Sequence, residues 1–281
     1  MAEPITRQRM MRLAAGIEYD GTAYHGWQAQ RHDPRTVQSV VEKALAVIAA
    51  EPVSVVCAGR TDAGVHASGQ VVHFDTEAMR DPYNWVMGTN TQLPEDVSLA
   101  WVRPVDARFH ARFSAQTRQY VYLIRRVPFR SALLRHAATP THRSLDPHRM
   151  AQAATALVGT HDFNAYRSVH CQAKTSVRTI HRLRIHAHDQ LLAVHVEADG
   201  FLQNMVRTIV GVLLAIGTGD AAVAWAGDVL ASGDRTQGGV TAPPQGLYFL
   251  GPTYGDLLSS EETVRIPPVV ASVLDTAPVE P

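Results

Sequence analysis

Short segments of alternating hydrophobic and polar residues run through the N-terminal part of the chain. These alternations predict strands at residues 12–19, 53–57, 69–74 and 96–102. A helix is predicted between Thr36, a suitable N-cap, and Pro52, because the apolar residues between them recur at helical spacing. A shorter helix is predicted over residues 82–91.

The rest of the chain repeats this mixture of strands and helices. Further strands are predicted at residues 119–124, 182–186, 191–197 and 246–250. Asp146-Pro147 is a strong helix start, and residues 201–216 carry apolar positions at helical spacing. Residues 259–281, rich in proline and acids, predict a disordered tail.

These elements predict an α+β protein with two similar subdomains. In each subdomain a mainly antiparallel sheet would carry helices on one face, and the pair would flank a cleft. The expected boundaries are a flexible N-terminus at 1–10, an N-terminal subdomain at 11–112, a C-terminal subdomain at 113–258 and the acidic, proline-rich tail at 259–281.

Charge is balanced overall but unevenly distributed. The chain has 281 residues, 46% of them hydrophobic, and its 26 basic and 26 acidic residues give a formal net charge of zero. From Arg103 to Arg143, however, nine arginines accompany a single acid, Asp106. Such a basic stretch can meet a polyanion even though the whole molecule is neutral.

Cysteine usage and apolar runs indicate a cytoplasmic protein. Cys57 and Cys171 are the only cysteines, so neither a disulfide framework nor a cysteine zinc site is indicated. The longest apolar stretch, residues 208–216, is too short to span a bilayer, and the N-terminus has no signal-peptide pattern. We therefore expect no membrane association.

The densest group of reactive side chains lies between two predicted strands, at residues 58–66. Its glycines permit sharp turns, and Arg60, Asp62 and His66 are presented together. An arginine beside Asp62 would lower the pKa of the carboxyl group, and an ionised carboxylate can act as a nucleophile or as a base. The alternative is a polar turn in which the carboxylate only accepts hydrogen bonds from main-chain amides.

Five segments of the chain together resemble the tRNA pseudouridine synthase A family. They are Ile17-Glu18-Tyr19-Asp20-Gly21, His25-Gly26-Trp27-Gln28, the ten residues from Cys57 to His66, Phe109-His110-Ala111-Arg112-Phe113 and Met205-Val206-Arg207. Their order and spacing agree with the family from about residue 12 to residue 252. Before Met205, Gln203-Asn204 stands where the family often has a tyrosine or histidine.

The resemblance implies an enzyme that isomerises uridine to pseudouridine in the anticodon stem-loop of tRNAs, at tRNA positions 38, 39 and 40. It implies a pseudouridine synthase fold with a basic active-site cleft, a homodimer, and a reaction that needs no metal, no cofactor and no nucleotide. By the same resemblance Asp62 is the catalytic nucleophile and acts on a flipped-out uridine.

The resemblance also implies roles for residues around Asp62. Arg60 would enter the space left by the flipped base, Tyr120 would stack on the uracil, Arg207 would pair with Asp62, and Leu247 would pack against the target base. Contacts to the RNA backbone are expected from part of the arginine-rich stretch: Arg112, Arg118, Arg125 and Arg126.

Two other functions remain open at this point. One is a non-catalytic RNA-binding protein that flips bases without reacting with them. The other is a hydrolase that uses Asp62 and His66 on a small phosphorylated or glycosylated substrate. His66, His110 and His161 match no zinc spacing and are expected to be structural or to contact RNA.

Overall fold

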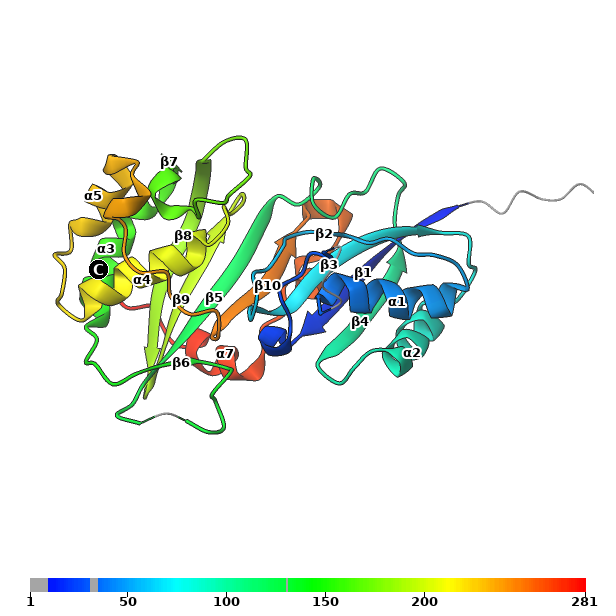
Figure 1. Cartoon of the computed structure of the whole chain (residues 1–281), viewed down its shortest axis with the longest axis horizontal. Coiled ribbons are helices and arrows are strands. Elements are labelled where there is room, and N and C mark those ends of the chain that lie inside the picture. The colour runs from blue at the N-terminus through cyan, green and yellow to red at the C-terminus, as the bar shows by residue number, and fades with distance from the viewer. Residues whose placement is uncertain (1–9, 31–34, 130) are drawn as a thin grey trace, which may run out of the picture.

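The computed structural model describes residues 10–30, 35–129 and 131–281. The predicted flexible N-terminus at 1–10 therefore lies outside the described residues except for Met10. An elongated sheet runs through the molecule, with helices packed against it at both ends (Figure 1). The predicted α+β class is confirmed.

The N-terminal half of the sheet follows the predicted pattern closely. It contains β1 (Met11–Tyr19), β2 (Val56–Cys57), β3 (His66–Thr76) and β4 (Val97–Pro104), with helices α1 (Val37–Ala49) and α2 (Pro82–Gln92). Thr36 caps α1, since its side chain accepts a hydrogen bond from the main-chain nitrogen of Ser39. Strand β2 is shorter than predicted, because only Val56 and Cys57 pair with β3.

The described residues of the C-terminal half up to Thr253 form six strands and three helices. The strands are β5 (Thr117–Arg126), β6 (Thr139–Thr141), β7 (Gly159–Asp162), β8 (Val177–His188), β9 (Leu191–Ala198) and β10 (Leu247–Thr253). The helices are α3 (Pro147–Ala154), α4 (Met205–Gly217) and α5 (Trp225–Ser232). Asp146 caps α3 as predicted, but α4 begins later than residue 201, because its N-cap Asn204 adopts a left-handed backbone conformation with φ of 62°.

The two halves share one continuous sheet, where the sequence predicted a separate sheet in each. The strand order is β4-β1-β3-β10-β5-β9-β8-β7, and short 3₁₀ turns at 21–23, 155–157, 164–166, 235–237 and 255–257 link the elements. Late in the chain, β10 inserts between β3 and β5. It pairs in parallel with β3 through Tyr248 with His66 and Phe249 with Ala67, and antiparallel with β5. This parallel contact is the junction between the halves.

The apolar core lies mainly on the helical face of the sheet. One continuous cluster of buried residues includes side chains from both halves, among them Trp27, Trp85, Tyr122 and Phe249. A smaller cluster lies on the opposite face of the central strands and contains Val121, Leu123 and Ala193. The central strands are therefore buried on both faces.

The prediction of a disordered tail at 259–281 is wrong. This segment forms α6 (Ser260–Thr263) and α7 (Pro268–Leu274), and α7 packs against β8 and β9. Val270 and Val273 are fully buried in the smaller cluster, and the main-chain nitrogen of Val279 donates to the carbonyl of Ile185 at 2.8 Å. Composition misled because the prolines and acids flank a short apolar helix that covers the back of the sheet.

Replacing Val273 with alanine should lower the free energy of unfolding by about 2 kcal/mol, because it leaves a cavity in the smaller cluster. Denaturant unfolding followed by circular dichroism measures this change. Ser272→Ala, at an exposed position of the same helix, is the control and should stay within about 0.5 kcal/mol of the wild type. Equal stability of Val273→Ala and the wild type would show that α7 does not contribute to the core.

Candidate active site

The segment that carries Asp62 lies at the junction of the two sheet halves. Residues 58–65, called the Asp62 loop below, connect β2 to β3. The first residue after the loop, His66, is also one of the two β3 residues that pair with β10. Asp62 therefore lies close to the point where the C-terminal half meets the N-terminal half.

Main-chain contacts from residues 19–28 hold the Asp62 loop in place. The nitrogen of Trp27 donates to the carbonyl of Thr61 at 3.0 Å, and the nitrogen of Gly64 donates to the carbonyl of Tyr24 at 3.2 Å. A Cβ atom at Gly21 would lie 2.0 Å from the carbonyl oxygen of Val65, so only glycine permits this approach. Residues of the first two family-like segments thus hold the third segment, which contains the Asp62 loop, in place.

A buried amide and a phenol hold the loop from inside the sheet. The Gln70 side chain on β3 donates to the carbonyl of Gly59 at 2.6 Å and accepts from the Gly59 nitrogen at 3.4 Å. The hydroxyl groups of Tyr19 and Thr61 are 2.8 Å apart. Because the side chains of Tyr19, Thr61 and Gln70 are buried, these contacts fix the loop backbone around Asp62.

The expected ion pair between Arg207 and Asp62 is present. Arg207, in the first turn of α4, places NH1 3.4 Å from Oδ2 of Asp62, and the two side chains are 16% and 28% exposed. The same guanidinium donates to the carbonyl of Ala242 at 2.8 Å and to the side-chain oxygen of Asn204 at 3.3 Å. The Arg207 side chain is therefore oriented by Asn204 at the helix start and by the carbonyl of Ala242 as well as by Asp62.

The expected direction of the Asp62 pKa is wrong. Burial raises the pKa of this carboxyl group above its ordinary value, and the nearby Arg207 guanidinium only partly offsets this effect. In the described part of the chain, Arg207 is the one cation within ion-pair distance of Asp62, and Arg60 is exposed to solvent. A half-buried carboxylate with a raised pKa is a stronger base than a solvated one.

Tyr120 and Leu247 lie on the adjoining strands β5 and β10. Tyr120 is buried, with its ring centroid 4.9 Å from that of Phe249 and 5.1 Å from that of Phe201. Burial raises the pKa of Tyr120, and the Asp62 carboxylate is close enough to add to the increase, so the phenol stays protonated. Leu247 is 4% exposed and pairs with Tyr122 on β5.

The four arginines that were expected to contact the RNA backbone differ in their exposure to solvent and in their hydrogen bonds within the protein. Arg112 is exposed, whereas Arg118 donates to the main-chain carbonyls of Ala58, Arg112, Ala115 and Asp199. Arg125 and Arg126 contact the hairpin at residues 189–190. At about 3.3 Å per residue, Arg125 is about 17 Å along β5 from Tyr120.

His66 is a structural residue in this arrangement. Its side chain is 5% exposed and stacks on Tyr248 with ring centroids 4.8 Å apart. Nδ1 accepts from the Gly21 nitrogen at 3.2 Å and lies 3.0 Å from a carboxylate oxygen of Asp20, while Nε2 donates to the carbonyl of His136 at 2.7 Å. With both ring nitrogens engaged, His66 is not presented to a small substrate, which disfavours the hydrolase alternative.

Three residues that contact site groups were given no role from the sequence: Tyr19, Gln70 and Asn204. The only signal for Gln70 is a polar residue inside an apolar strand, where a fully buried side chain needs partners. Asn204 precedes Arg207 by one helical turn, a spacing that lets side chains meet, but its left-handed backbone could not be foreseen.

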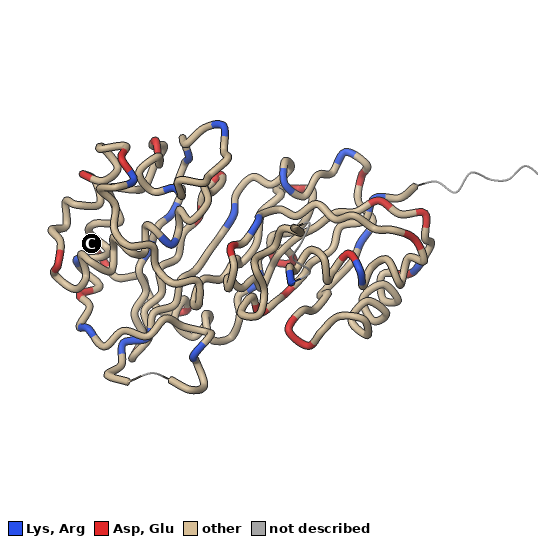
Figure 2. Tube along the Cα trace, viewed as in Figure 1, with Lys and Arg blue, Asp and Glu red and all other residues tan. Residues whose placement is uncertain are grey.

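Neither a charged block nor a metal site marks Asp62. Basic and acidic positions are interspersed over both halves of the molecule (Figure 2). A cavity of about 270 Å³ lies between α3, β8 and residues 278–281, away from Asp62. This cavity is not the expected cleft around Asp62, which therefore stays a prediction. Within the described ranges no group of three or more His, Cys, Asp or Glu residues could hold a metal ion, and no helix has the length and apolar character to cross a membrane.

Comparison with known proteins gives consistent matches. The family model described as tRNA pseudouridine synthase matches residues 15–114 and 153–255. A tRNA pseudouridine synthase A from Pseudomonas aeruginosa is 52% identical over 243 residues, which cover 86% of this chain and 85% of that protein. Its counterpart from Alcanivorax borkumensis is 51% identical over 250 residues, or 89% and 94% of the two chains.

Among solved structures, an H/ACA ribonucleoprotein bound to a substrate RNA containing 2′-deoxyuridine aligns over 72% of this chain and 43% of the chain in that structure. The sequence identity is 13% and the TM-score is 0.34, so this likeness is too distant to inform function. The family model and the curated relatives span both the Asp62 loop and the helix that carries Arg207. The chain therefore belongs to the tRNA pseudouridine synthase family.

Proposed function

We propose that this protein isomerises uridine to pseudouridine in tRNA and that the Asp62 carboxylate is its reacting group. The observation that carries the proposal is the ion pair of Asp62 with Arg207, half-buried on a loop that main-chain contacts hold rigid. A catalytic group needs such a fixed position, because small displacements from the reacting atoms cost large factors in rate.

The reaction fits a single carboxylate. The bond between N1 of the uracil and C1′ of the ribose breaks, a bond from C1′ to C5 of the same uracil forms, C5 loses its proton, and N1 regains one. The substrate is neither oxidised nor reduced overall. The Asp62 carboxylate can trap C1′, add to the uracil ring or remove a proton beside C1′, and burial makes it more reactive in each of these roles.

The substrate uridine must leave its base stack before a side chain reaches its glycosidic bond. Arg60 is exposed close to Asp62 on the same loop, and its planar guanidinium suits the space that the base vacates. Tyr120 offers an uncharged ring for stacking on the uracil, and Leu247 offers an apolar contact.

The family resemblance supports the finer parts of the proposal. These are the anticodon stem-loop as the target, a homodimeric assembly and a cytoplasmic location. Arg112 is the arginine most available for the RNA backbone, since it is exposed. Arg118 instead suits a positioning role, because its guanidinium is occupied by four main-chain carbonyls.

Replacing Asp62 with asparagine should slow pseudouridine formation by about 10³-fold or more, because the shape is kept but the carboxylate is lost. Affinity for tRNA should change less than about threefold, since phosphate contacts carry most of it. Carbodiimide-resistant adducts on an unmodified tRNA transcript measure the product, and filter binding measures affinity.

Asp228→Asn, at an exposed acid of α5, is the matched control and should behave as the wild type. A wild-type rate for Asp62→Asn would contradict the proposal. Tight tRNA binding without product by the wild type would favour the non-catalytic alternative, and release of free uracil would favour the hydrolase.

Replacing Arg207 with glutamine should move the acid limb of the pH–rate profile to higher pH. The reaction needs ionised Asp62, so the rate falls as pH decreases through the Asp62 pKa. Burial raises that pKa and Arg207 lowers it, so removing Arg207 leaves burial unopposed. Single-turnover rates across the pH range test this shift. Arg184→Gln, at an exposed position of β8, should leave the limb in place, and a limb shifted downward in Arg207→Gln would overturn the assignment.

A further inference from the structure

The loop between β4 and β5 exposes one aromatic ring and buries another. Phe113 is 77% exposed, whereas Phe109 of the same loop is 3% exposed and packs against Tyr254. Single exposed apolar side chains are common on protein surfaces, so what distinguishes Phe113 is the fixed geometry around it.

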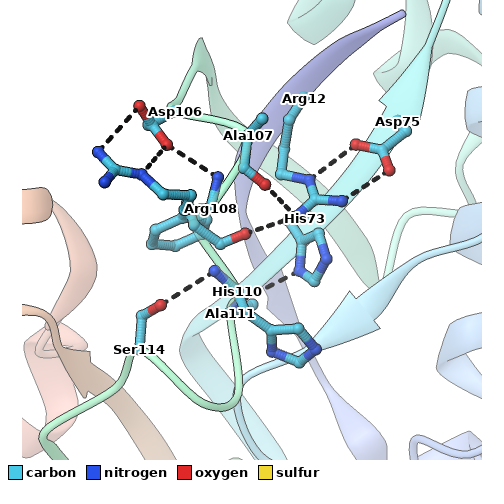
Figure 3. A network of polar contacts seen from close by, with 10 residues as sticks. Arg12, His73, Asp75, Asp106, Ala107, Arg108, His110, Ala111 and Ser114 are labelled. Carbon is cyan, nitrogen blue, oxygen red and sulfur yellow. Dashed lines mark hydrogen bonds and ion pairs between the residues drawn. The ribbon is translucent and has the colours of Figure 1, made fainter.

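The exposed ring sits on a rigid base. Arg12 on β1 binds both carboxylate oxygens of Asp75 at 2.7 Å, and its NH1 donates to the carbonyls of Ala107 at 2.7 Å and Phe109 at 2.9 Å (Figure 3). On β3, Nδ1 of His73 accepts from the Ala111 nitrogen at 3.1 Å. These contacts tie the loop to two strands of the sheet.

His110 fixes the orientation of Phe113. Its Nδ1 accepts from the main-chain nitrogens of Arg112 at 3.2 Å and Phe113 at 3.1 Å, and burial lowers its pKa, so the imidazole is neutral. The rings of His110 and Phe113 are stacked, with centroids 4.3 Å apart and planes at 27°. The guanidinium of Arg112 lies 5.6 Å from the Phe113 centroid. His110, Arg112 and Phe113 are called the aromatic shelf below.

The aromatic shelf is anchored to the Asp62 loop by one guanidinium. The same nitrogen of Arg118, NH2, donates to the carbonyl of Arg112 on the shelf and to that of Ala58, the first residue of the Asp62 loop, at 3.4 Å. The aromatic shelf therefore lies close enough to the Asp62 loop for one bound polymer to contact both.

We propose that Phe113 stacks on an unpaired base of the tRNA substrate while Arg112 contacts a phosphate of the same strand; this inference rests on the proposed function. Every base has a π face that an exposed aromatic ring can cover, and an arginine beside the ring supplies the charge for the backbone. His110 holds the ring in place, because its Nδ1 accepts from the main-chain nitrogens of Arg112 and Phe113.

Variants of Phe113 separate stacking from simple apolar contact. Phe113→Leu keeps an apolar side chain but cannot stack, and it should weaken tRNA binding by roughly 5- to 50-fold. Phe113→Tyr keeps the ring and should bind within about twofold of the wild type. Tyr83→Leu, at an aromatic on α2 that is 70% exposed, is the matched control and should leave binding unchanged.

Salt dependence and base fluorescence give independent readouts. Phe113→Leu should keep the wild-type slope of log K against log salt, whereas Arg112→Gln should reduce that slope by about one. In anticodon stem-loops that carry 2-aminopurine at one unpaired position at a time, the wild type and Phe113→Tyr should quench the fluorescence of the label at one of these positions. Phe113→Leu should not quench it.

Wild-type affinity in Phe113→Leu, or equal losses in the leucine and tyrosine variants, would overturn the shelf proposal, and the former result would point to a protein partner instead. These binding results stand apart from the activity test. A wild type that forms no pseudouridine would refute the proposed function, whereas an inactive Asp62→Asn beside a fully binding Phe113→Leu would refute the shelf alone.

Discussion

The ion pair between Asp62 and Arg207 is the interaction on which the site depends. It joins residues 145 positions apart in the chain, one on a loop of the N-terminal sheet half and the other at the start of α4. The parallel pairing of β3 with β10 brings the two halves together beside it. Because the pair is half-buried, burial and the guanidinium act on the carboxylate in opposite directions, and its reactivity follows from their balance.

The surroundings of this pair are built from main-chain contacts more than from side-chain charges. The Asp62 loop receives hydrogen bonds from Trp27 and Gln70 and donates one to the Tyr24 carbonyl, while Arg118 ties it to the loop between β4 and β5. Except for the Arg118 guanidinium, these contacts fix position without adding charge to the loop. Family-like segments that are far apart in the sequence therefore come together around the Asp62 loop, because each supplies different contacts to it.

The sequence predicted much of this, and the failures have physical causes. Sequence pattern located α1 well because it buries one regular face, and it located β1 and β5 well because each contains a continuous run of buried residues. The Asp62–Arg207 contact followed from family resemblance, yet the sign of the Asp62 pKa did not, since the depth of burial is a property of the folded molecule. The single sheet escaped prediction because β10 pairs across a long sequence separation, and α7 because its few apolar residues sit among prolines and acids.

The role of Asp62 as the group that reacts with an everted uridine is tested most directly by the structure of Asp62→Asn bound to an unmodified tRNA. We expect the target uridine to be everted from its stack, with C1′ within about 4 Å of the residue 62 side chain and Arg207 still in contact with that side chain. A uridine that remains stacked in the complex, or a different carboxylate nearest to C1′, would contradict it.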